Sequence, residues 1–202
     1  MSGLLVGAVF GAVFVFVNAR SPLDDVVVTV LRVLASLAVA AMLALWFVAV
    51  RRPAEEGSPG ETGEDRRGGM FGRGYLIVVA VEVLLLFGGL RVLAALDVPA
   101  EVNVAWVAIV VGVHFVALAP VWKDRVIAVP GAALTLLGIA GFLMAWAGSL
   151  LWVPVVSGVA SGAVLLTGCL TSGLWLARPR TDPAETAQVL PAPDGTAATA
   201  RR

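Results

Sequence analysis

Four ionisable side chains lie inside long apolar runs of this sequence: Arg32, Glu82, Arg91 and His114. An ionisable group in a hydrocarbon environment costs several kcal/mol, so such residues are usually paired or functional. A carboxylate and an imidazole can take up and release protons, and a guanidinium can hold an anion. The four residues therefore indicate either a proton relay with an anion contact or polar pairs that fix the register of helices.

The depth of Glu82 and His114 in their runs is similar. Glu82 follows Gly74 by eight residues, about 12 Å along a helix, and His114 precedes Pro120 by six, about 9 Å. On consecutive antiparallel helices the two side chains would meet, so we predict an ionic or hydrogen-bonded pair. Asn103 precedes His114 by eleven residues and so shares its helix face. These three residues form the predicted intramembrane polar set.

The two arginines belong to the other half of the predicted spans. Arg32 lies about 10 Å from Asp25, and Arg91 lies within two turns of the end of its run. Both side chains are long enough to extend toward the membrane surface, where acidic residues follow the helix ends. The predicted outer-side charge cluster consists of Arg32, Arg91, Asp24, Asp25, Asp97 and Glu101.

Composition assigns the chain to the membrane class. Hydrophobic residues make up 59% of the 202 residues and charged residues only 14%, with a mean hydropathy of +0.95. The net charge is zero, which gives no indication of a nucleic-acid partner. One cysteine and one histidine exclude a disulfide framework and make a metal site or metal cofactor unexpected.

Apolar runs long enough to span a bilayer predict an all-α fold, a polytopic transmembrane bundle of six helices. The predicted helices cover residues 3–18, 26–50, 74–96, 102–121, 126–147 and 151–177. The first run has an alternative, a cleaved secretory signal ending at Val17-Asn18-Ala19. Met1-Ser2-Gly3 lacks the positive charge of such signals, so an uncleaved helix is favoured.

The remaining segments are polar. Residues 51–73 are rich in Gly, Pro, Glu and Arg and predict a polar cytoplasmic loop within a transmembrane domain of residues 1–177. Residues 178–202 predict a disordered cytoplasmic tail.

The positive residues predict the orientation. Eleven cations fall on one side of the predicted spans, in residues 51–73, 123–125 and 178–202. Positive residues gather on the cytoplasmic side, so both termini are predicted to be cytoplasmic in a bacterial inner membrane. All six tryptophans fall near predicted helix ends, where interfacial aromatic residues prefer to lie.

Two pairs of glycines at four-residue spacing predict close helix packing. Gly7 and Gly11 share one face of the first helix, and Gly158 and Gly162 share one face of the last. Small residues at this spacing allow backbones to approach within a membrane. The spacing leaves the partner open: another helix of the chain, a second copy in a homo-oligomer, or a membrane partner. The lipid bilayer itself is the other expected partner.

One stretch carries a resemblance. At VAIVVGVHFVALAPVWKDR, with FGRGYLIVVAVEVLLLFGG before it, the chain resembles uncharacterised small actinobacterial membrane proteins. Those are similar six-helix proteins with a Gly-x-His-Phe element in the fourth helix. The resemblance extends over residues 1–177 and is most specific at Gly112–Ala119. It implies the six-helix class and draws attention to His114, but it implies no activity.

The sequence contains no phosphate-binding Gly loop, no HExxH and no GxSxG, so an enzyme is not expected. The favoured function is a structural or interaction role in the membrane. The alternative is a small proton- or ion-coupled permease in which Glu82 and His114 titrate and Arg32 contacts an anion. A membrane-embedded enzyme is the third and least favoured class.

Overall fold

The structure, a computed structural model, describes residues 2–51 and 73–177, and in these ranges it is helical without strands. The long helices are α1 (Ser2–Asn18), α2 (Asp25–Arg51), α4 (Arg73–Ala95), α5 (Asn103–Trp122), α6 (Ala128–Trp146) and α7 (Ala160–Ala177). A π-helical segment, η4 (Pro154–Val159), leads directly into α7. The prediction of an all-α fold with six helices is confirmed. The predicted loop interior and tail, residues 52–72 and 178–202, lie outside the described residues.

Five of these helical segments are long and apolar enough to cross a membrane. The exception is α1, whose 17 residues extend for about 25 Å and fall short of a hydrocarbon core of about 30 Å. The chain therefore has the composition and the helix lengths of a membrane protein.

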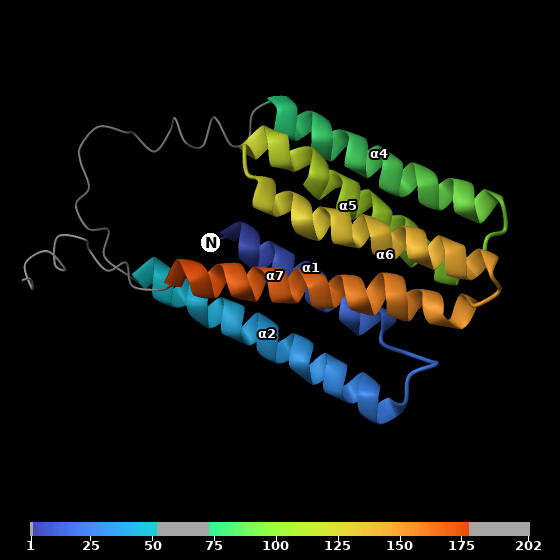
Figure 1. Ribbon diagram of the computed structural model, residues 1–202, viewed down its shortest axis with the longest axis horizontal. Coiled ribbons are helices and arrows are strands. Elements are labelled where there is room, and N and C mark those ends of the chain that lie inside the picture. The colour runs from blue at the N-terminus through green and yellow to red at the C-terminus, as the bar shows by residue number, and fades with distance from the viewer. Residues whose placement is uncertain (1, 52–72, 178–202) are drawn as a thin grey trace, which may run out of the picture.

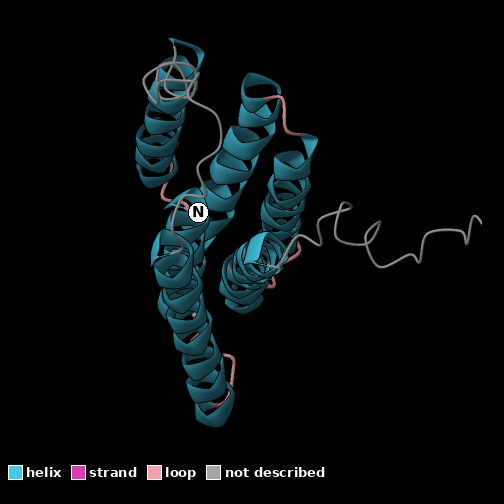
Figure 2. Ribbon diagram, turned by 90° about the vertical axis from the view of Figure 1, so that its left-hand side faces the viewer, coloured by secondary structure: helices cyan, strands magenta, loops and turns pink. Residues whose placement is uncertain are grey.

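The helices pack as two groups. In one, α1 lies against α2 and α7; in the other, α5 and α6 form a close hairpin and α4 packs on the outer side of α5. Contacts of α6 with α7 and η4 join the two groups. Figures 1 and 2 both have α4 at the top of the bundle and α2 at the bottom, so these helices form opposite flanks.

Successive helices run in alternate directions and share two ends. At the left-hand end in Figure 1, α2 ends at Arg51, α4 begins at Arg73 and α7 ends at Ala177. The turn from α5 to α6 lies at the same end and contains Lys123, whose φ of 55° is left-handed and ends α5. The tight turn between α6 and α7 lies at the opposite end and contains Gly148, whose φ is 80°.

Glycines bring backbones together inside each group. A Cβ on Gly11 would lie 2.9 Å from the carbonyl oxygen of Gly162, and one on Gly131 would lie 2.7 Å from that of Gly112. Both distances are too short for a side chain, so only glycine permits these helix crossings.

The two predicted glycine faces therefore pack mainly on each other. Gly7 lies against Cys169 and Gly158 lies against Asn18, so α1 and the η4–α7 segment cover one another's small residues. An oligomer would have to use another surface.

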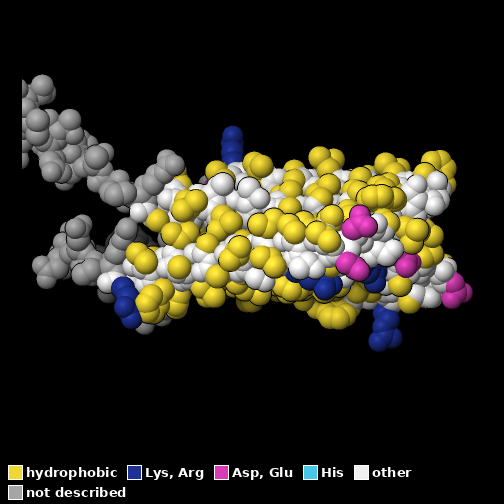
Figure 3. Space-filling view, turned by 90° about the horizontal axis from the view of Figure 1, so that it is seen from below, with side chains coloured by type: hydrophobic (Ala, Val, Ile, Leu, Met, Phe, Trp, Pro, Cys, Tyr) yellow, Lys and Arg dark blue, Asp and Glu magenta, His cyan; other side chains and the backbone are white. Residues whose placement is uncertain are grey.

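Large apolar side chains cover the outside of the bundle. In the most hydrophobic part of α4 none of the residues is buried, and in that of α2 only 11% are. Figure 3, which views the bundle from below, displays mostly hydrophobic side chains with few charged ones. Exposed apolar surface of this extent is unusual for a protein solvated by water and normal for one solvated by lipid.

Candidate functional site

The carboxylate of Glu82 on α4 meets the imidazole of His114 on α5. Glu82 Oε2 lies 2.9 Å from His114 Nδ1, and the side chains are 21% and 13% exposed. His114 Nδ1 makes no hydrogen bond of acceptable geometry, so the contact is a close polar pair without an aligned hydrogen bond. It becomes an ion pair when the imidazole is protonated. Such a pair can exchange a proton or fix the register of α4 against α5.

A tryptophan joins the same two helices nearer the end of the bundle where α4 ends and α5 begins. The indole Nε1 of Trp106 on α5 donates a hydrogen bond to the carbonyl oxygen of Leu85 on α4, at 3.0 Å. The indole ring lies over Gly89, where any Cβ would collide with it, whereas Gly88 has open space at its own Cβ position. The position of Trp106 near a helix end predicted only an interfacial location, and nothing in the sequence indicated this packing role.

Asn103 does not join the pair. It is the first residue of α5, half-buried, and lies about 16 Å from His114 along the helix. The shared face predicted for the two residues does not bring them into contact. Within residues 2–51 and 73–177 the Asn103 side chain makes no hydrogen bond.

Arg32 binds the end of a neighbouring helix. Its Nη2 donates to the carbonyl oxygens of Phe16, at 3.3 Å, and Ala19, at 3.2 Å. The last carbonyls of a helix have no partner within it and carry the negative end of the helix dipole, so a guanidinium stabilises them. The cation thus joins α2 to the end of α1, a role that the spacing along α2 could not indicate.

The six residues of the predicted outer-side charge cluster divide into two groups. Asp24, Asp25 and Arg32 belong to the α1–α2 connection and the first turns of α2, whereas Arg91, Asp97 and Glu101 belong to the last turns of α4 and the α4–α5 connection. The two groups lie at the same end of the bundle but on opposite flanks (Figure 1). Among the described residues no ion pair joins either arginine to these acids. They are not one cluster, because α2 and α4 do not pack as neighbours.

Arginine spacing defines the depth of the site. Arg32 and Arg51 are 19 residues apart on α2, and Arg73 and Arg91 are 18 apart on α4. Both spacings correspond to about 28 Å, close to the thickness of a hydrocarbon core. Glu82 lies nine residues from each arginine of α4, so the pair with His114 lies near the centre of that stretch.

A second buried polar group lies where η4 passes α1 and α6. The Ser157 hydroxyl donates to the carbonyl oxygen of Leu137 at 2.9 Å, and the Asn18 amide donates to that of Phe14 at 2.8 Å. The Ser161 hydroxyl is fully buried without a hydrogen-bond partner. Gly158, next to Ser157 in the chain, was expected only as a small packing residue.

No group of three or more potential metal ligands occurs in the described parts of the chain. No protein-family model, curated protein or solved structure matches the sequence. The fold and the polar residues define the class: an all-helical bundle with five helices long and apolar enough to span a membrane and a polar pair between α4 and α5.

Proposed function

We propose that this is a multi-pass protein of a bacterial cytoplasmic membrane with both termini in the cytoplasm, and that its role is structural or an interaction with other membrane components. The bacterial origin is inferred from the resemblance at Gly112–Ala119 and from the preference for arginine over lysine. No enzymatic reaction is proposed.

The observation that carries the proposal is the separation of the groups that a permease would need. Arg32 is bound to α1 on the α2 flank, whereas Glu82 and His114 lie between α4 and α5 on the other flank. Between the flanks, α1 and α7 meet at Gly11 and Gly162, and the α5–α6 crossing is equally close. A single path from an anion contact at Arg32 to the titratable pair would have to pass through these packed helices.

The alternative, a small permease in which a proton moves through the Glu82–His114 pair, is favoured by the central depth of that pair. Flux into liposomes distinguishes the two functions. We expect proton and solute flux at background for the wild-type protein and equally for Glu82→Gln and His114→Ala, because no route joins the pair to a second site. Flux above that of protein-free liposomes that is lost in both variants would support the permease instead.

The orientation has its own test. In a Cys169→Ala background, a membrane-impermeant maleimide added to intact cells should label Ser149→Cys, in the α6–α7 turn. It should label Arg125→Cys, in the α5–α6 turn, only after the cells are permeabilised. Both positions are exposed at opposite ends of α6, so each is the other's control. Labelling of Arg125→Cys in intact cells would reverse the proposed orientation.

A further inference from the structure

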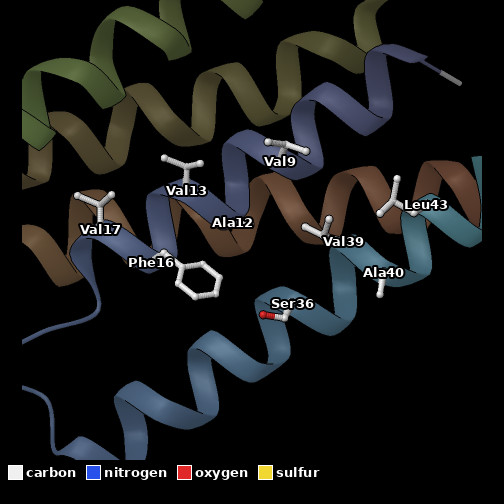
Figure 4. Close-up of a pocket in the computed structure, with 9 residues that line it drawn as sticks. All are labelled: Val9, Ala12, Val13, Phe16, Val17, Ser36, Val39, Ala40 and Leu43. Carbon is white, nitrogen blue, oxygen red and sulfur yellow. The ribbon is translucent and has the colours of Figure 1, made fainter.

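An apolar groove runs between α1 and α2 on the outside of the bundle, with a volume of about 460 Å³. Figure 4 shows its two walls, one from each helix, with Phe16 and Ser36 directed into the space between them. The groove exists because α2 packs on α7 around Met42 and Gly173 but diverges from α1 toward Asp25 (Figure 1).

The groove, together with Arg32 at one end of it, extends over about the depth of one membrane leaflet. Along α2 it reaches from Ser36, one turn from Arg32, to Leu43. The distance from Arg32 to Leu43 is about 16 Å, half of a hydrocarbon core of about 30 Å. Because Arg32 and Arg51 bracket a stretch of core thickness, Arg32 lies at the boundary of the hydrocarbon and the groove extends from there toward its centre.

Arg32 has unused donors at this boundary. The side chain is exposed, and only Nη2 is bound, to two carbonyl oxygens of the α1 end. A guanidinium has five N–H groups, and the others have no acceptor among the described residues. A phosphate is the ligand that a guanidinium binds best in two-point geometry.

The charges beyond Arg32 indicate a zwitterionic headgroup. Asp25 precedes Arg32 by two helical turns, so both lie on one face of α2, and Asp24 lies beside it. Both acids are exposed, and neither has a cationic partner among the described residues. Arg20, also exposed, is a cation in the same connection, so this end of the two helices carries both signs of charge. A zwitterionic headgroup matches both signs, because its ammonium group, outward of the phosphate, would be attracted to the two carboxylates.

We propose that this face binds one phosphatidylethanolamine molecule: its phosphate on Arg32, its ammonium toward Asp24 and Asp25, and one acyl chain in the α1–α2 groove. With the orientation proposed above, this lipid belongs to the outer leaflet. The occupied groove would complete the packing between the diverging helices.

The test is native mass spectrometry of the protein after purification with an equimolar mixture of phosphatidylethanolamine and phosphatidylglycerol. The wild-type chain should retain phosphatidylethanolamine in preference to phosphatidylglycerol. Arg32→Gln should retain about tenfold less, since a charge-assisted hydrogen bond contributes about 1.5 kcal/mol or more. Arg91→Gln is the matched control: an exposed arginine at comparable depth on α4, outside this groove, which should bind like wild type.

A second pair of variants leaves Arg32 in place. Ala40→Trp fills the groove from an exposed position of its α2 wall and should displace the lipid, whereas Ala80→Trp, at an exposed position on α4, should not. Equal lipid retention by Arg32→Gln and Arg91→Gln, or by the two tryptophan variants, would overturn the proposal. So would a preference of the wild-type chain for phosphatidylglycerol.

Discussion

Replacing Gly162 with leucine should separate α1 from α7 and lower the free energy of unfolding by about 3 kcal/mol or more. A Cβ at this position would lie 2.5 Å from the carbonyl oxygen of Gly11 and 2.8 Å from a methyl group of Val15. The backbone of α1 cannot move away without losing its other contacts with α7. The measurement is the midpoint of unfolding of the purified protein in detergent, followed by helical circular dichroism.

Gly168→Leu is the control for that experiment. It adds the same side chain to the same helix, at a glycine whose Cβ would have nothing within 4 Å. Its midpoint should stay close to that of the wild type. If both variants were equally stable, the close approach of Gly11 to Gly162 would not contribute to the fold.

The sequence predicted the helices well because their lengths are set by a physical dimension. The apolar stretches between Arg32 and Arg51 and between Arg73 and Arg91 match the thickness of a bilayer core. The length of the apolar run alone therefore identified these helices, without a helical periodicity of apolar residues. The boundaries that moved are those where a turn or a proline intervenes. The last helix, for example, begins with a π-helical segment at Pro154, which has no backbone N–H to donate.

The contact between Glu82 and His114 was also within reach of the sequence, because two polar residues at similar depth on consecutive antiparallel helices have few other partners. The glycine partners were not, since GxxxG spacing identifies a close face but not the helix that covers it. Arg32 was assigned to an acidic cluster because acidic side chains are the expected partners of a cation. In the structure it instead binds the carbonyl oxygens at the end of the short helix α1. The contrast between Gly88 and Gly89 depends on the rotation of α4 against Trp106, which one sequence does not reveal.

Helix α4 packs mainly on α5, so the Glu82–His114 pair is one of the few polar contacts that hold it to the bundle. Glu82→Leu and His114→Leu should each destabilise the protein by about 3 kcal/mol, since each leaves an ionisable group in a mostly buried apolar site without its partner. The double variant should lose less than either single one, because an apolar pair of similar size leaves nothing uncompensated.

The measurement is a double-mutant cycle on unfolding in detergent micelles, with all four proteins compared at one pH. We expect a coupling free energy of about 3 kcal/mol or more between the two positions, because single losses of about 3 kcal/mol each would sum to about 6 and the double variant should lose less than about 3. Leu84→Ala, at an exposed position on α4 two residues from Glu82, should show no coupling to His114→Leu. Additive losses for Glu82 and His114 would mean that their proximity of 2.9 Å does not stabilise the bundle, and α4 would then be held by Trp106 and apolar contacts alone.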